Sequence, residues 1–122
     1  MGTFQKLSTL SLAEVILAIA QTMIGDDDPD FYVGAFKSAK ATGLQITTED
    51  GERRSNVLGN TNSDGYVVNV GGRKDYNYES GHALDTATRF DFGHDEPYQA
   101  ARCLVDWLKN GTLPTDRQAS SF

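Results

Sequence analysis

The densest group of side chains with catalytic or metal-binding chemistry lies in residues 89–98, RFDFGHDEPY. His94, Asp95 and Glu96 are adjacent in this segment. Adjacent residues at the start of a helix point in different directions, and no second histidine stands at the (i, i+4) spacing of helical zinc ligands. Pro97 is typical of the first turn of a helix, for which Asp95 or His94 would be the cap. The segment therefore predicts a capped helix start and no metal site.

Residues 60–66, NTNSDGY, match the first half of a calcium-binding loop, with oxygen-bearing side chains at alternate positions. The bidentate glutamate that completes such a loop would stand at position 71, which is a glycine. The residues after 66 also have the pattern of a strand, whereas a calcium loop leads into a helix. We therefore expect a polar turn here.

Two nucleophilic side chains, Ser80 and Cys103, need consideration. Ser80, His82 and Asp85 are the side-chain types of a hydrolase triad. In an extended segment Asp85 points away from the other two, and Ser80 lacks the strand-to-helix turn that exposes such a nucleophile. A hydrolase using Ser80 and His82 is therefore the least favoured hypothesis. Cys103 lies in the middle of an expected helix, away from the helix N-terminus that would lower its pKa, so we expect an inert thiol.

Residues 71–80, GGRKDYNYES, have the composition of a binding loop. Two glycines free the backbone, an arginine and a lysine bring positive charge to an acidic protein, and two tyrosines alternate on one side of an extended segment. Such a loop suits a partner protein or a small anion such as a nucleotide. A plain strand connection is the competing interpretation. The anion-binding alternative uses Arg73, Lys74, Tyr76, Tyr78 and His82.

Acidic residues gather around positions 26–30, DDDPD, and 49–52, EDGE. One or two aspartates suffice to cap a helix at the first segment, and the others are surplus to that role. A surface of like charges attracts a basic partner surface and speeds association with it. The predicted partner-binding residues are Asp26, Asp27, Asp28, Asp30, Glu49, Asp50 and Glu52.

Charge and composition restrict the classes of function. Seventeen acidic against eleven basic residues give a formal net charge of −6, which disfavours direct nucleic-acid binding. The apolar stretch 12–24 contains Glu14 and is shorter than the roughly 20 residues that span a bilayer. With a single cysteine the chain has no internal disulfide, so we expect a cytoplasmic protein. No phosphate loop, dinucleotide fingerprint or complete ligand set predicts a cofactor.

Residues 11–24 predict a helix that is apolar around most of its circumference. Ser11 and Glu14 have the spacing of a reciprocal capping box, and Gly25 is typical of a helix end. The apolar surface of this helix exceeds what a small sheet covers on one side. We therefore expect a homodimer through this first helix.

Residues 28–42 predict a second helix. Asp28 is a suitable cap, Pro29 a suitable first residue, and apolar side chains recur at helical spacing until Gly43. The competing interpretation is a strand over residues 31–36, FYVGAF, because aromatic and β-branched side chains favour strands.

Beyond the second helix the apolar period changes to that of strands. The pair Asp50-Gly51 between two alternating runs is a strong hairpin signal. Residues 65–72 and 82–92 predict further strands, and residues 94–111 return to helical spacing.

This order of elements predicts an α+β domain. It consists of two N-terminal helices, an antiparallel meander of three to four strands, and a C-terminal helix packed on one face of the sheet. We expect a single domain over residues 1–114 and a loose tail over residues 115–122.

The leading functional hypothesis is a small, acidic, non-catalytic binding module that occupies a basic surface of another protein. An inhibitor or immunity-type protein, encoded by a phage or mobile element, fits this size and charge. An enzyme is the minority interpretation, since no catalytic set is complete.

Overall fold

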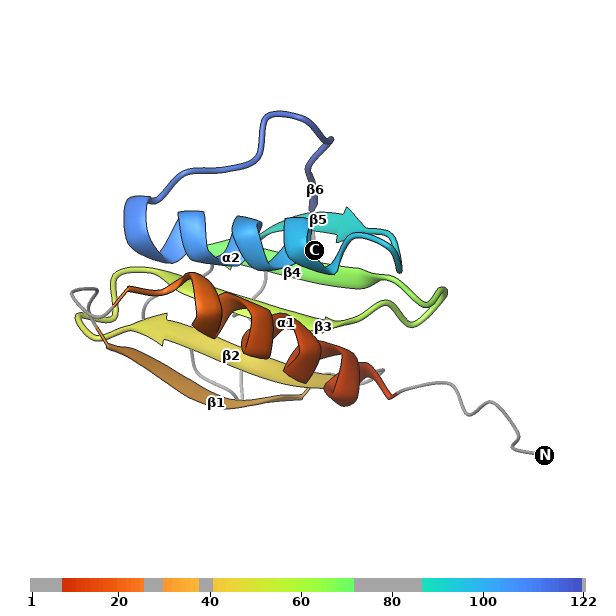
Figure 1. Cartoon of the computed structure of the whole chain (residues 1–122), viewed down its shortest axis with the longest axis horizontal. Helices are drawn as coiled ribbons and strands as arrows, with labels where there is room; N and C mark the ends of the chain where they lie inside the picture. Colours follow the sequence, from red (N-terminus) through yellow and green to blue (C-terminus); the bar gives the residue numbers. More distant parts are fainter. Residues whose placement is uncertain (1–7, 26–29, 38–40, 72–86, 122) are drawn as a thin grey trace.

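The chain folds into two layers, with both helices on one face of an antiparallel sheet (Figure 1). The computed structural model describes residues 8–25, 30–37, 41–71 and 87–121. The predicted α+β class is confirmed. The helices are α1 (Thr9–Met23) and α2 (Pro97–Asn110). Each strand of the sheet pairs with the next strand along the chain. The strands are β1 (Phe31–Lys37), β2 (Thr42–Thr48), β3 (Arg54–Gly59), β4 (Tyr66–Gly71), β5 (Ala87–Phe92) and the short β6 (Ser120–Ser121).

The second predicted N-terminal helix is wrong, because Phe31–Lys37 form strand β1, paired antiparallel with β2. The aromatic and β-branched residues of this segment favour a strand, and Gly34 disfavours a helix interior. The meander is accordingly longer than the three to four strands we predicted.

Helix α1 begins two residues before the predicted capping box. Ser8 is its N-cap, and the Ser8 Oγ accepts a hydrogen bond from the Ser11 amide at 3.0 Å. Ser11 is thus inside the first turn, and Glu14 is exposed. A polar residue three positions earlier serves the same physical purpose, which is to satisfy an amide that has no partner within the helix.

The predicted Asp50-Gly51 turn joins β2 to β3. Gly51 has a φ of 75°, a left-handed conformation that glycine adopts without strain. Its amide donates to the Thr48 carbonyl oxygen at 2.9 Å, which closes the turn. The pairing of Thr47 with Arg54 then sets the register of the hairpin.

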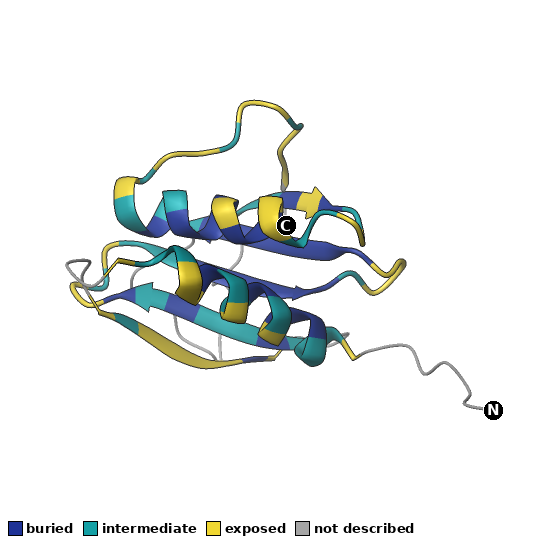
Figure 2. Cartoon of the chain, viewed as in Figure 1, coloured by how far each residue is buried: buried dark blue, intermediate teal, exposed yellow. Residues whose placement is uncertain are grey.

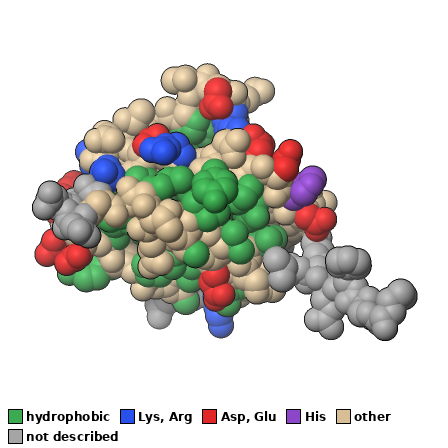
Figure 3. All heavy atoms as spheres, in the orientation of Figure 1, with side chains coloured by type: hydrophobic (Ala, Val, Ile, Leu, Met, Phe, Trp, Pro, Cys, Tyr) green, Lys and Arg blue, Asp and Glu red, His purple; other side chains and the backbone are tan. Residues whose placement is uncertain are grey.

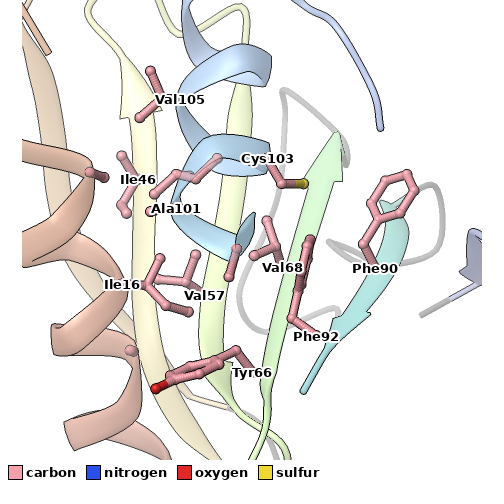
Figure 4. Packing of buried hydrophobic residues seen from close by; sticks show 14 of the residues in the cluster. Ile16, Ile46, Val57, Tyr66, Val68, Phe90, Phe92, Ala101, Cys103 and Val105 are labelled. Carbon is pink, nitrogen blue, oxygen red and sulfur yellow. The ribbon is translucent and has the colours of Figure 1, made fainter. Parts of the chain in front are cut away.

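The hydrophobic core lies between the sheet and the two helices (Figure 2). Helix α1 packs on β2 and β3, α2 packs mainly on β4, and the helices also pack against each other. In Figure 4, Ile16 of α1 meets Val57 of β3, while Cys103 of α2 lies near Val68 and Phe90. Because α2 shields part of the apolar surface of α1, less of it remains for the homodimer, which stays a prediction.

The two ends of helix α2 are stabilised in different ways. Pro97 is in its first turn as predicted, but the N-cap is Glu96, without a side-chain capping bond, and not Asp95 or His94. At the other end Arg53 Nη1 donates to the carbonyl oxygens of Leu108 and Lys109, both at 3.1 Å. An arginine at a helix C-terminus satisfies free carbonyls and opposes the negative end of the dipole. Over the described residues, no helix has the length and apolar character needed to cross a membrane.

Candidate protein-binding surface

The structure brings the described residues of the two predicted acidic segments together at one end of the sheet. Phe31 of β1 pairs with Thr48 of β2, so Asp30 and Glu49 both lie just beyond this last cross-strand pair. Asp30, Glu49 and Glu52 are all exposed. Acidic side chains are grouped at this end of the molecule, at the left of Figure 3. We call Asp30, Glu49 and Glu52 the acidic end.

Asp50 has a structural role within the same turn. Its Oδ1 accepts hydrogen bonds from Thr48 Oγ1 at 2.6 Å and from the Glu52 amide at 2.9 Å. Such side-chain to backbone bonds are typical of aspartate in a turn. Asp50 therefore stabilises the turn, and the partner-binding role that we predicted for it stays a prediction. Asp26, Asp27 and Asp28 lie outside the described residues.

Strand β1 is an exposed edge of the sheet next to the acidic end. In the described part of the sheet it pairs only with β2. Residues 32–35 are exposed in succession, and Tyr32 and Val33 retain 61% and 47% of their accessible surface. Figure 2 shows this strand as an exposed margin beside a buried sheet. Large apolar side chains on a sheet edge invite pairing with another chain.

A groove runs between β1 and α1, with a volume of about 380 Å³. Val33 faces the helix layer because it pairs with Ile46, a core residue. Asp30 of the acidic end also lines the groove. Its apolar lining comes from α1 and the residue after it, from β1 and β2, and from α2: Leu17, Ala20, Ile24, Phe31, Val33, Ile46, Leu104, Val105 and Leu108. We call this the β1 groove.

A second hollow of about 540 Å³ lies between α2 and residues 112–119, which pass over the helix and which we call the arch (Figure 1). Tyr98, Leu113 and Pro114 give it apolar walls, and Arg102 and Asp106 add opposite charges. The hollow therefore has no net charge that selects an ionic ligand.

Cys103 also lines this hollow. Burial raises the pKa of its thiol to about 12, since the low-polarity surroundings disfavour the thiolate. The thiolate is the nucleophilic form, so this raised pKa disfavours nucleophilic reactivity near neutral pH. The inert thiol stays a prediction.

A row of polar side chains crosses the sheet on the face opposite the helices. Gln45 pairs with Asn56, Asn56 with Asn69, and Asn69 with Arg89. Asn56 and Asn69 retain only 8% and 0% of their accessible surface. Among the residues that the structure describes, the Asn56 Oδ1 and both polar atoms of the Asn69 side chain have no hydrogen-bond partner.

Sequence reasoning missed this row. The available signal was an asparagine within a run of valines in a buried strand, VVNV, because a buried polar residue needs a hydrogen-bond partner.

The remaining predicted sites divide into two groups. Residues 60–65 form the expected polar turn, and Tyr66 begins β4. In this turn the Asn60 Oδ1 accepts a hydrogen bond from the Asn62 amide at 2.8 Å, and the Asn60 amide donates to the Gly65 carbonyl oxygen. Among the described residues, no three His, Cys, Asp or Glu side chains form a metal-binding group.

The other group lies outside the described residues. It comprises the anion-binding and hydrolase candidates Arg73, Lys74, Tyr76, Tyr78, Ser80, His82 and Asp85.

Comparison with known proteins gives no family. No protein-family model matches the chain, and no curated protein or solved structure matches it at a significant level.

Proposed function

We propose that this protein is a small, acidic, non-catalytic binding module that occupies a basic surface of another protein. The observation that carries the proposal is the acidic end, where strand pairing places Asp30 beside Glu49, 19 residues further along the chain. Neither carboxylate has a cationic partner within the described structure. Adjacent like charges repel each other in the free protein, and a basic surface relieves that repulsion on binding.

An inhibitor or immunity-type protein is the class that we propose. Such a protein acts by covering a surface, so it needs charge and shape complementarity and no reacting groups. The raised pKa of Cys103 agrees with a non-catalytic role for the single thiol of the chain.

The test is quantitative affinity capture with matched charge-reversal variants. D30K/E49K reverses the two charges of the acidic end whose carboxylates make no ion pair with another described residue. E14K/D64K changes net charge by the same amount, but at exposed positions on α1 and in the β3–β4 turn. Tagged wild-type protein and both variants are incubated with host lysate, washed at low and then raised salt, and the retained proteins are quantified by mass spectrometry.

The proposal expects one dominant protein that wild type and E14K/D64K retain and that D30K/E49K loses. In a binding assay with that purified protein, D30K/E49K should weaken affinity about tenfold at low salt, mainly through a slower association rate. Equal retention by all three proteins, or no specifically retained protein, would rule out the acidic end as the binding surface.

A further inference from the structure

We propose that the partner docks on β1 by adding an extended segment to the sheet as a new strand. In this arrangement the segment places an apolar side chain in the β1 groove and a basic side chain beside Asp30 and Glu49. The inference rests on the proposed function, because the acidic end is what selects a basic partner.

The exposure of strand β1 favours the addition of a strand at this edge of the sheet. Strand β1 has seven residues, and four in succession are exposed, including two large apolar ones. Natural sheets protect their edges with proline, bulges, short strands or inward-pointing charges. Within β1 the only charge is Lys37 at its end, and the strand contains no proline. The centre of β1 is therefore a ready template for backbone pairing.

The β1 groove offers space for a side chain of the added strand. Side chains of an added strand alternate between the two faces of the sheet. Those on the helix side would lie next to Val33 and reach the wall that Leu17 and Ile24 form. Those on the other side would lie beside Tyr32, whose ring is largely exposed. Both faces of the docked segment thus gain apolar contact.

The β1 groove and the acidic end are next to each other. Asp30 lines the groove and directly precedes β1, and Glu49 directly follows the neighbouring strand β2 at the same end of the sheet. An extended chain rises about 3.3 Å per residue. A segment of about four residues therefore reaches from the level of Val33 to that of Asp30. One short segment with an apolar residue near one end and a basic residue near the other satisfies both sites.

The discriminating variant is V33E. It places a charge at the mouth of an apolar groove and on the centre of the edge, which opposes strand addition. It also makes the surface more acidic, so a purely electrostatic partner would bind it as well as wild type or better. Val33 is half exposed on an edge strand, so the variant should fold, and circular dichroism and thermal melting check this.

The probe is a phage-displayed library of random decapeptides, selected on immobilised wild-type protein. The proposal expects enriched peptides in which apolar residues alternate and a lysine or arginine stands near one end. Synthetic versions should bind E14K/D64K like wild type, bind D30K/E49K about tenfold more weakly, and show no measurable binding to V33E. Hydrogen exchange of the amides in 31–37 should slow on binding, since an added strand protects them.

The outcomes separate the two proposals. Basic peptides that bind wild type and V33E alike, but not D30K/E49K, would retain the acidic end and overturn strand docking. Peptides without basic residues that bind β1 and ignore D30K/E49K would overturn the basic partner and retain the docking edge. No enrichment, or a wild-type dimer in sedimentation that V33E dissociates, would overturn the docking of a foreign segment.

Discussion

The guanidinium of Arg117 lies over the ring of Phe92, 4.0 Å from the ring centroid. The same group donates to the Glu96 Oε2 at 2.8 Å and to the Asp91 carbonyl oxygen at 2.7 Å. These contacts attach the arch to the end of β5 and the start of α2. They lie in the segment for which the sequence predicted a loose tail.

Replacing Arg117 with alanine should therefore destabilise the domain. Loss of a cation–π contact at a partly exposed site costs about 0.5–1 kcal/mol. The melting temperature of R117A should fall by roughly 2–6 °C, measured by circular dichroism. Arg102, exposed on α2, gives the control R102A, which should melt like wild type. Equal melting of R117A and wild type would show that the arch is not held by Arg117.

Glu96 should make stability depend on acid pH. Its hydrogen bonds from Arg117 and from the Gly93 amide lower the pKa of the carboxyl in the folded protein. The unfolded chain then binds a proton more readily, so the contribution is present above the ordinary glutamate pKa and is lost as pH falls through the folded value. Urea unfolding at a series of pH values should show a smaller acid loss for E96Q than for wild type. Identical pH profiles would contradict this role for Glu96.

Cys103 should resist thiol reagents in the native state. Burial raises its pKa to about 12, so the reactive thiolate is scarce at pH 8 and the sulfur is covered. Labelling with a chromogenic disulfide should be slow in buffer and immediate in urea. Rapid stoichiometric labelling without denaturant would show that α2 opens readily or that the thiol is accessible.

The sequence predicted those elements whose local signals and tertiary partners agree. The Asp50-Gly51 turn and α2 have strong local signals, a glycine that tolerates positive φ and a proline in the first turn. Residues 31–37 carry both helical spacing and strand propensity, and only pairing with β2 decides between them. Local pattern alone is ambiguous there because both periods leave apolar residues on a common face.

The candidate site was predictable by residue type but not by position. Acidic residues at 30 and 49 are visible in the sequence, whereas their adjacency requires the register of β1 with β2. The β1 groove was not predictable, because it exists only once residues 31–37 form a strand beside α1. The polar row likewise depends on the registers of four strands.

Gly59 should be required for the packing of α1 on β3. A Cβ on Gly59 would lie 2.5 Å from the Leu12 Cδ1 and 3.0 Å from the Thr9 Cα, so a methyl group requires the buried Leu12 side chain to move and the start of α1 to shift slightly. Overpacking of this kind costs about 1–3 kcal/mol. Gly34 of β1 has open space around it, which makes G34A the matched control. Chemical unfolding should show G59A clearly destabilised and G34A close to wild type, and equal stabilities would contradict the close approach.

The Asn69 side chain should make the folded protein less stable than an apolar side chain at the same position would. Its side chain is fully buried, and neither polar atom has a hydrogen-bond partner among the described residues, so folding removes both from water without compensation from that part of the chain. Each such buried group costs about 1–3 kcal/mol. Valine suits a buried central strand, and N69V should raise the free energy of unfolding by about that amount. Thr47 is a half-buried polar residue of β2 on the sheet face that also carries Asn69. The control T47V should therefore change the free energy of unfolding less than N69V does. A loss of stability in N69V would mean that the Asn69 amide bonds to water or to another polar group, which high-resolution crystallography would then locate.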